Sequence, residues 1–157
     1  MMYKCKYISK IGVLTLVGDT ENLYELLFEE SRYGSKYPDA LEDNSLVIFH
    51  KVCMWLDAYF SGERYSVDFP IVLEGTSFQV EVWKLLLEIP YGKFVTYKDI
   101  ANGLNSRAYQ AVGNAIGRNP IGIIVPCHRV VKSHGLGGFS GTVAVKKWLL
   151  EHENIEV

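Results

Sequence analysis

The sequence has few cysteines and no long apolar run, and both absences narrow the class of protein. Only three cysteines occur among 157 residues, at the widely separated positions Cys5, Cys53 and Cys127. An odd, scattered set argues against a disulfide framework. No CxxC or HxxxH spacing is present, so we expect no metal site. No apolar run reaches the roughly 18 residues that a transmembrane helix needs, so we expect no membrane association.

The N-terminus also lacks the features of a secretory signal. Its first residues, MMYKCKYISKIGVLTLVGD, alternate apolar and polar side chains without a long apolar core or a small-residue cleavage site. Such alternation is typical of a β-strand and not of a signal peptide, which favours an intracellular protein. The hydrophobic share of 48% is enough to bury a core in one large domain or two small ones.

The small net charge of −2 hides an uneven distribution along the chain. Residues 1–90 carry a net charge of −6, residues 91–147 carry +7, and residues 148–157 carry −3. Lysines and arginines gathered in one block can displace counterions from phosphates, so the basic middle is where a polyanion would bind. The alternative is that this block only balances the acidic half across an internal interface.

Hydrophobic periodicity predicts a mixed N-terminal half. Alternation over residues 3–8 and 11–18 predicts an antiparallel hairpin, and residues 23–28 fit a third strand or a short helix. Residues 33–45 are loop-like, and residues 65–73 again alternate like a strand. Between them, residues 46–60 have helical spacing. The expected inward side chains of this helix are Leu46, Phe49, Val52, Cys53, Leu56, Tyr59 and Phe60.

A boundary is expected near Glu74, and helices dominate after it. Thr76 and Gln79 fit a capping box at the start of a helix over residues 78–89. Its expected inner face is Phe78, Val82, Leu85, Leu86 and Ile89. A final helix is expected over residues 143–155, with Val145, Trp148, Leu149 and His152 inward.

Two short helical patterns between these helices read as a helix-turn-helix. Thr96 can cap the first, and Asn105 and Ser106 make the turn. The second is rich in alanine and glycine, so its backbone could approach a ligand closely. Its expected inner side chains are Ala108, Ala111, Val112, Ala115 and Ile116, and its outer ones are Arg107, Gln110, Asn114 and Arg118. The alternative is a small solvated helix packed on its neighbour.

The segment PCHR contains a candidate nucleophile. Cys127 is followed directly by His128, an imidazole that could accept the thiol proton if Pro126 introduces a turn. A carboxylate could orient the imidazole, and Glu153 is preferred over Glu151 because it lies near the buried stripe of the last helix. In isolation each residue also has a structural interpretation: a buried inert thiol, a satisfied core histidine and a solvated helix-end charge.

Six segments of the second half, read in order, resemble one known family. They are GTSFQVEVW, IPYGKFVTYKDIA, QAVGNAIGRNPI, IVPCHRVV, GGFSG and KKWLLEHE. Together they closely resemble the C-terminal domain of the O6-alkylguanine-DNA alkyltransferases over about residues 74–154. The resemblance implies an α+β fold. A small ribonuclease-H-like α/β domain at 1–73 would precede a mainly helical helix-turn-helix (winged-helix-like) domain at 74–157 that carries the active site.

The resemblance also implies a mechanism for these residues. Cys127 would take the alkyl group of a flipped-out guanine as a thioether, while His128 accepts the thiol proton through water and Glu153 holds the imidazole. Asn119 would fix the active-site turn. Tyr97 would hydrogen-bond the guanine and help to neutralise the charge on the departing base.

Further residues follow from the same resemblance. The carbonyls of Cys127 and Val130 would read the guanine amino group, the Ser140 amide would donate to O6, and Gly138 would line the pocket. Arg129 would be structural, tying the two domains or the helix-turn-helix. The DNA-binding residues would be Thr96, Arg107, Gln110, Ala111, Gly113 and Arg118, with the second helix in the minor groove.

One residue departs from the family pattern. Many members have an arginine before the AVG segment that acts as a wedge, because it fills the space left by the flipped base. This chain has Gln110 at that position. Glutamine lacks the charge and stacking plane of arginine, so we expect weaker DNA affinity, or a share of the wedge role for Tyr109 or Arg107.

The resemblance implies one turnover per molecule, on double-stranded DNA containing O6-alkylguanine, by a monomer without cofactor or metal. Whether O4-alkylthymine is accepted stays open. Two rival hypotheses make different predictions. A thiol hydrolase using Cys127 and His128 would turn over repeatedly. A DNA-binding module with an inert Cys127 would be indifferent to Cys127→Ala.

Overall fold

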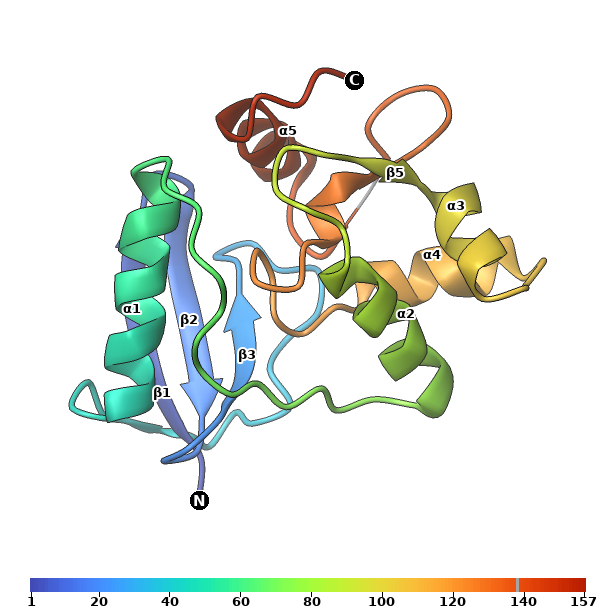
Figure 1. Ribbon diagram of the computed structural model, residues 1–157. Helices are drawn as coiled ribbons and strands as arrows, with labels where there is room; N and C mark the ends of the chain where they lie inside the picture. Colours follow the sequence, from blue (N-terminus) through green and yellow to red (C-terminus); the bar gives the residue numbers. More distant parts are fainter. Residues whose placement is uncertain (138) are drawn as a thin grey trace.

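A computed structural model describes residues 1–137 and 139–157 and shows a mixed α+β fold (Figure 1). The N-terminal part is a four-stranded sheet with the order β3-β2-β1-β4. Strands β1 (Tyr3–Ser9) and β2 (Gly12–Gly18) form the expected antiparallel hairpin, and Ser9 pairs with Gly12. The region at 23–28, left open between strand and helix, is strand β3 (Leu23–Leu27).

Two expectations for the N-terminal half are wrong. Strand β4 (Leu41–Glu42) pairs parallel to β1 within the stretch expected to be a loop. Residues 65–73 form no strand beyond one isolated bridge between Leu23 and Ile71. Pro70 has no amide hydrogen to donate to a neighbouring strand. Its carbonyl accepts from Leu23, and Val72 donates back to the Leu23 carbonyl, so the segment only touches the sheet edge.

Helix α1 (Val47–Phe60) packs against the sheet, as its spacing predicts. Leu46, Cys53 and Phe60 were expected to be buried, but they are only half-buried, while Ile48 was overlooked and is buried. The buried stripe is therefore rotated slightly from the expected one. It consists of Ile48, Phe49, Val52, Leu56 and Tyr59.

Helix α2 (Ser77–Leu87) opens the C-terminal part with the expected capping box. The Gln79 amide donates to Thr76 Oγ1 at 3.1 Å, and the Gln79 side chain accepts from the Thr76 amide. Phe78 and Leu85, expected inward, are only half-buried. Trp83, which the apolar pattern did not include, is buried, and its indole donates to the Ala115 carbonyl at 2.8 Å. That bond fixes α2 against α4.

The helix pair after α2 consists of α3 (Tyr97–Gly103) and α4 (Tyr109–Gly117). Thr96 caps α3 as expected. In α4 the expected burial of Val112, Ala115 and Ile116 is confirmed, but that of Ala108 and Ala111 is wrong. Ala108 is the N-cap residue and Ala111 lies in the first turn, where the apolar spacing continues but the cover from α2 and α3 ends.

A short parallel strand pair joins this helix pair to the segment of Cys127. Strand β5 (Val95–Thr96) pairs with β6 (Val130–Val131), which the sequence did not indicate. The chain ends with helix α5 (Val143–His152), where Leu149 is buried and Val145, Trp148 and His152 are half-buried. Side chains from the sheet, α1 and the C-terminal helices form one continuous apolar core.

Candidate active site

The segment before Cys127 is held as a tight loop by Asn119. The Asn119 side-chain amide donates to the Val125 carbonyl at 2.7 Å, and its oxygen accepts from the Ile121 amide at 3.1 Å. Ile123 within this loop has a φ of 67°, a conformation that a β-branched residue rarely adopts. Two side-chain hydrogen bonds thus hold a strained backbone immediately upstream of the candidate nucleophile.

Cys127 opens a short 3₁₀ turn over Cys127–Arg129, which confirms the turn expected after Pro126. Its side chain is fully buried, and its Sγ lies 3.8 Å from Ser140 Oγ. The other two thiols lie in the N-terminal part. Burial raises the pKa of Cys5, and it raises the pKa of Cys53 to about 11. Neither is therefore a ready nucleophile at neutral pH.

His128 and Glu153 form a buried pair. His128 Nε2 lies 2.6 Å from Glu153 Oε2, and both side chains are fully buried, whereas Glu151 is exposed. Burial lowers the pKa of His128 despite the opposing effect of the Glu153 hydrogen bond. Burial alone would raise the pKa of Glu153, but His128 and Arg129 outweigh it and hold that pKa well below its usual range.

The hydrogen bond to Glu153 determines the tautomer of the neutral imidazole. An ionised carboxylate can only accept, so the proton of the neutral ring lies on Nε2 and Nδ1 presents a lone pair. Nδ1 is buried and has no hydrogen-bond partner within residues 1–137 and 139–157. His128 therefore carries a basic nitrogen that its structural contacts do not use.

Glu153 also binds three groups besides His128. Arg129 Nε donates to Oε1 at 2.7 Å, the Tyr59 hydroxyl donates to Oε2 at 2.7 Å, and the Gly92 amide donates to Oε1 at 3.2 Å. Arg129 also donates to the Ile89 carbonyl, so it ties the end of α2 to the residue that follows α5. Tyr59 was expected only as a core residue of α1.

The β5–β6 pair brings Tyr97 close to the end of the segment that runs from Cys127 to Val131. Tyr97 starts α3 directly after Thr96, whose partner is Val131. Lys146, which the sequence reasoning missed, is fully buried, and its Nζ donates to the Val130 carbonyl at 2.6 Å and lies 5.8 Å from the centre of the Tyr97 ring. Burial lowers the pKa of Lys146 to about 8. Gly138, also expected at this site, lies outside the described residues.

The outer face of α4 carries the residues expected to bind DNA. Arg107, Gln110 and Ala111 are exposed, and a Cβ atom added at Gly113 would meet no atom within 4 Å. Arg118 is exposed at the far end of α4, but its guanidinium stacks on the Tyr33 ring at 4.2 Å. Thr96 Oγ1 is occupied in accepting from the Asp99 amide.

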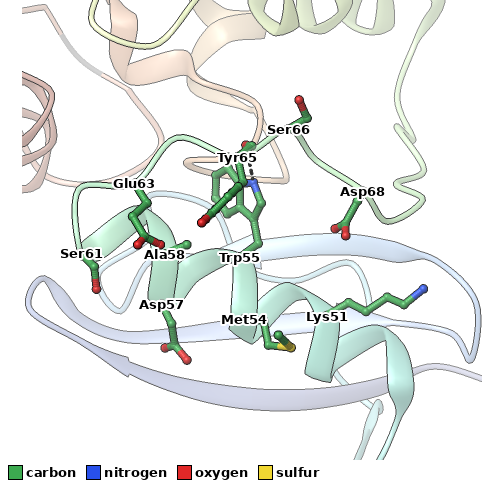
Figure 2. Close-up of a pocket in the computed structure, with 10 residues that line it drawn as sticks. All are labelled: Lys51, Met54, Trp55, Asp57, Ala58, Ser61, Glu63, Tyr65, Ser66 and Asp68. Atoms are coloured by element: carbon green, nitrogen blue, oxygen red, sulfur yellow. Dashed lines mark hydrogen bonds between the residues drawn. The ribbon is translucent and has the colours of Figure 1, made fainter.

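Two hollows differ in their relation to this site. One of about 760 Å³ lies between α1 and residues 61–68, where Figure 2 shows the Trp55 indole bonded to the Tyr65 carbonyl. It contains none of the expected site residues. A smaller one of about 210 Å³ is lined by Asn119 and Ser140 among others, so it borders the Cys127 segment.

Within the described part of the chain, no cluster of three or more His, Cys, Asp or Glu side chains is arranged to hold a metal ion. Within the same residues, no helix is both long and apolar enough to cross a membrane.

Fold and site together define a class of protein. A small sheet domain precedes a helical domain, and the helical domain holds a buried cysteine next to a histidine–glutamate pair. The chain belongs to the 6-O-methylguanine DNA methyltransferase family. Residues 2–73 match the ribonuclease-like domain of that family, and residues 77–155 match its DNA binding domain. The resemblance stated from the sequence is thereby confirmed.

Relatives match over nearly the whole chain. The methylated-DNA–protein-cysteine methyltransferase of Methanosarcina acetivorans is 42% identical, over 97% of this chain and 98% of that protein. The protein of the same name from Haemophilus influenzae is 38% identical, over 98% and 87%. The crystal structure of Mycobacterium tuberculosis OGT in complex with DNA superposes with a TM-score of 0.89 at 40% identity, over 96% of this chain and 92% of that one.

Proposed function

We propose that this protein repairs DNA by moving the alkyl group of O6-alkylguanine irreversibly onto Cys127, once per molecule. The observation that carries the proposal is the His128–Glu153 pair beside Cys127, with Nδ1 buried and unused. A neutral imidazole held in this tautomer has a free lone pair on Nδ1 that can accept a proton, and the adjacent Cys127 thiol can supply that proton.

The bond changes follow from these roles. His128 Nδ1 accepts the Cys127 proton through a water molecule, and Glu153 stabilises the imidazolium that results. The sulfur then attacks the alkyl carbon, the bond from that carbon to O6 breaks, and its electron pair returns to the purine. A stable thioether remains, and no step in the site reverses it. No cofactor or metal takes part.

The base-binding roles are assigned to the residues around Cys127. Tyr97 hydrogen-bonds the extruded guanine and helps to neutralise the departing base, and the Ser140 amide donates to O6. The carbonyls of Cys127 and Val130 receive the guanine amino group. Because the Cys127 side chain is fully buried, the protein must open beside the sulfur when the base enters.

The partner we propose is double-stranded DNA, bound by a monomer inside the cell. Arg107, just before α4, and Gln110, Ala111 and Gly113 within it would enter the minor groove, where small residues permit close approach. Arg118 and Thr96 would bind the flanking backbone, for which Arg118 must leave the Tyr33 ring. Residues 1–73 and 74–157 would act as a supporting and a reacting domain.

Intact-mass analysis after incubation with a duplex containing one O6-methylguanine tests the proposal. We expect each molecule to gain the mass of one CH₂, mapped to Cys127 and absent from Cys127→Ser. Consumption of one equivalent of lesion per protein molecule, with no further reaction, distinguishes this protein from a thiol hydrolase, which would continue to turn over. Binding of lesion DNA with no mass gain would reduce the protein to a DNA-binding module and overturn the proposal.

A further inference from the structure

The end of strand β3 is hydrogen-bonded to the segment that leads to Cys127. The Leu26 amide donates to the Pro120 carbonyl at 2.9 Å, and the Gly122 amide donates to the Leu26 carbonyl at 3.0 Å. β3 is the strand of the sheet that lies nearest the helical part (Figure 1). The N-terminal sheet is therefore joined through its backbone to the loop that Asn119 closes.

Phe28, directly after β3, fills the space between two parts of the site. Its side chain is buried, and its ring centre lies 5.3 Å from that of Phe139. A Cβ atom added at Gly122 would lie 2.5 Å from the Phe28 ring, and one added at Gly141 would lie 3.1 Å from it. Both segments thus rest directly on this one aromatic ring.

The same N-terminal stretch also holds the residue that faces the sulfur. The Arg32 amide donates to the Ser140 carbonyl at 2.9 Å. Ser140 is buried, and its Oγ lies 3.8 Å from Cys127 Sγ. Residues of the N-terminal part thus contact both the Ser140 segment and the loop before Cys127, and so help to set the distance between Ser140 and Cys127.

We infer that Phe28 and the backbone amide of Arg32 are positioning elements for alkyl transfer, an inference that rests on the proposed function. They hold the Ser140 segment at the distance from Cys127 that places O6 and its alkyl carbon in line with the sulfur. In-line displacement is sensitive to such placement, because a misalignment of about 1 Å can cost about a hundredfold in rate. Neither residue is among those proposed to bind the base.

Single-turnover methyl transfer, followed by mass spectrometry over a range of lesion-DNA concentrations, tests this inference. Phe28→Ala should lower the maximal rate about tenfold or more, and Phe28→Leu should recover part of it. The half-saturating DNA concentration should stay within about twofold, because the exposed face of α4 is untouched. Met54→Ala, at the α1 hollow of Figure 2, serves as the control.

The end point of each reaction separates positioning from folding. An unfolded fraction lowers the amount of protein that finally reacts, whereas a displaced loop lowers the rate at which all molecules react. A full amplitude with a slow rate supports the inference. A maximal rate within about twofold of the unaltered chain overturns it, as does a loss confined to the amplitude.

A pair of substitutions at position 32 isolates the backbone hydrogen bond. Arg32→Pro removes the amide hydrogen that Ser140 accepts, while Arg32→Ala removes only the side chain. The rate of Arg32→Pro should fall well below that of Arg32→Ala, and equal rates would contradict the role of the amide. If the unaltered chain gains no mass either, the proposed function fails and not this inference alone.

Discussion

The hydroxyl of Tyr59 and the imidazole of His128 donate to the same oxygen of Glu153, at 2.7 Å and 2.6 Å. Tyr59 belongs to α1, whereas His128 and Glu153 belong to the C-terminal part. The orientation of the candidate base therefore depends on a side chain from the other half of the chain. Burial, together with the Glu153 charge, raises the pKa of Tyr59 far above its usual range, so the phenol remains a donor.

Tyr59→Phe should weaken this link without opening a cavity. We expect the free energy of unfolding to fall by about 2 kcal/mol, because a hydrogen bond to a charged acceptor is lost. Methyl transfer should also slow, since the carboxylate gains freedom to turn away from the imidazole. Urea unfolding and single-turnover rates measure the two effects, with Tyr65→Phe as the exposed control. Unchanged stability would mean that the bond contributes nothing.

Acid should destabilise the fold in two steps. His128 has a pKa below its ordinary 6.5, so below that pH the unfolded chain takes up a proton that the folded chain refuses, and stability falls. Glu153 has a pKa below its ordinary 4.5, so its stabilising contribution is present above that pH and is lost as the pH falls further.

Urea unfolding between about pH 8 and pH 4 measures both steps. In His128→Gln the first decline should be shallower than in the unaltered chain, while the second remains. A stability that is flat down to about pH 5 in the unaltered chain would contradict a buried neutral histidine.

At alkaline pH, Lys146 should make the free energy of unfolding rise with pH. Its pKa of about 8 lies below the ordinary 10.5, so the folded chain loses this proton first and gains stability as the pH rises through that interval. Cys127, His128, Lys132 and Tyr97 are titratable groups that face it. The stability of the unaltered chain relative to Lys146→Met should therefore rise between about pH 8 and pH 10. A constant difference would contradict the buried charge.

Gln110→Arg tests the departure from the family pattern. Arginine at this exposed position adds a charge and a stacking plane toward the DNA, so we expect tighter binding of lesion duplexes. The logarithmic salt dependence should steepen by about one unit if the new charge meets a phosphate. Fluorescence anisotropy over a salt series measures both quantities, and Gln110→Ala shows what glutamine contributes. Equal affinity of all three would place the wedge role elsewhere.

Local patterns predicted local features well. The hairpin, the capping box at Thr76, the cap at Thr96 and the burial of Val112, Ala115 and Ile116 in α4 depend on neighbours within a few residues, and these predictions are confirmed. Alternation over 65–73 misled, because an alternating stretch still needs a partner strand and Pro70 removes a donor.

Other features of the site could not be predicted, because they depend on long-range contacts. The pairing of β5 with β6 and the Tyr59–Glu153 bond join residues far apart in the chain. Lys146 is the instructive intermediate case. Its position three residues before Leu149 and four before Leu150 places it on the buried face of α5, but a charged side chain adds nothing to an apolar pattern.

The ring of Phe28 leaves no room for a side chain at Gly122, and together with Phe139 it leaves little room for one at Gly141. Substitution at either glycine is therefore constrained by Phe28. A side chain at Gly122 requires the aromatic ring to move or to be replaced by a smaller group, so we expect changes at Gly122 to accompany changes at Phe28. Engineering of the reactive centre meets the same rule, because variants built one position at a time would miss the combinations that fold.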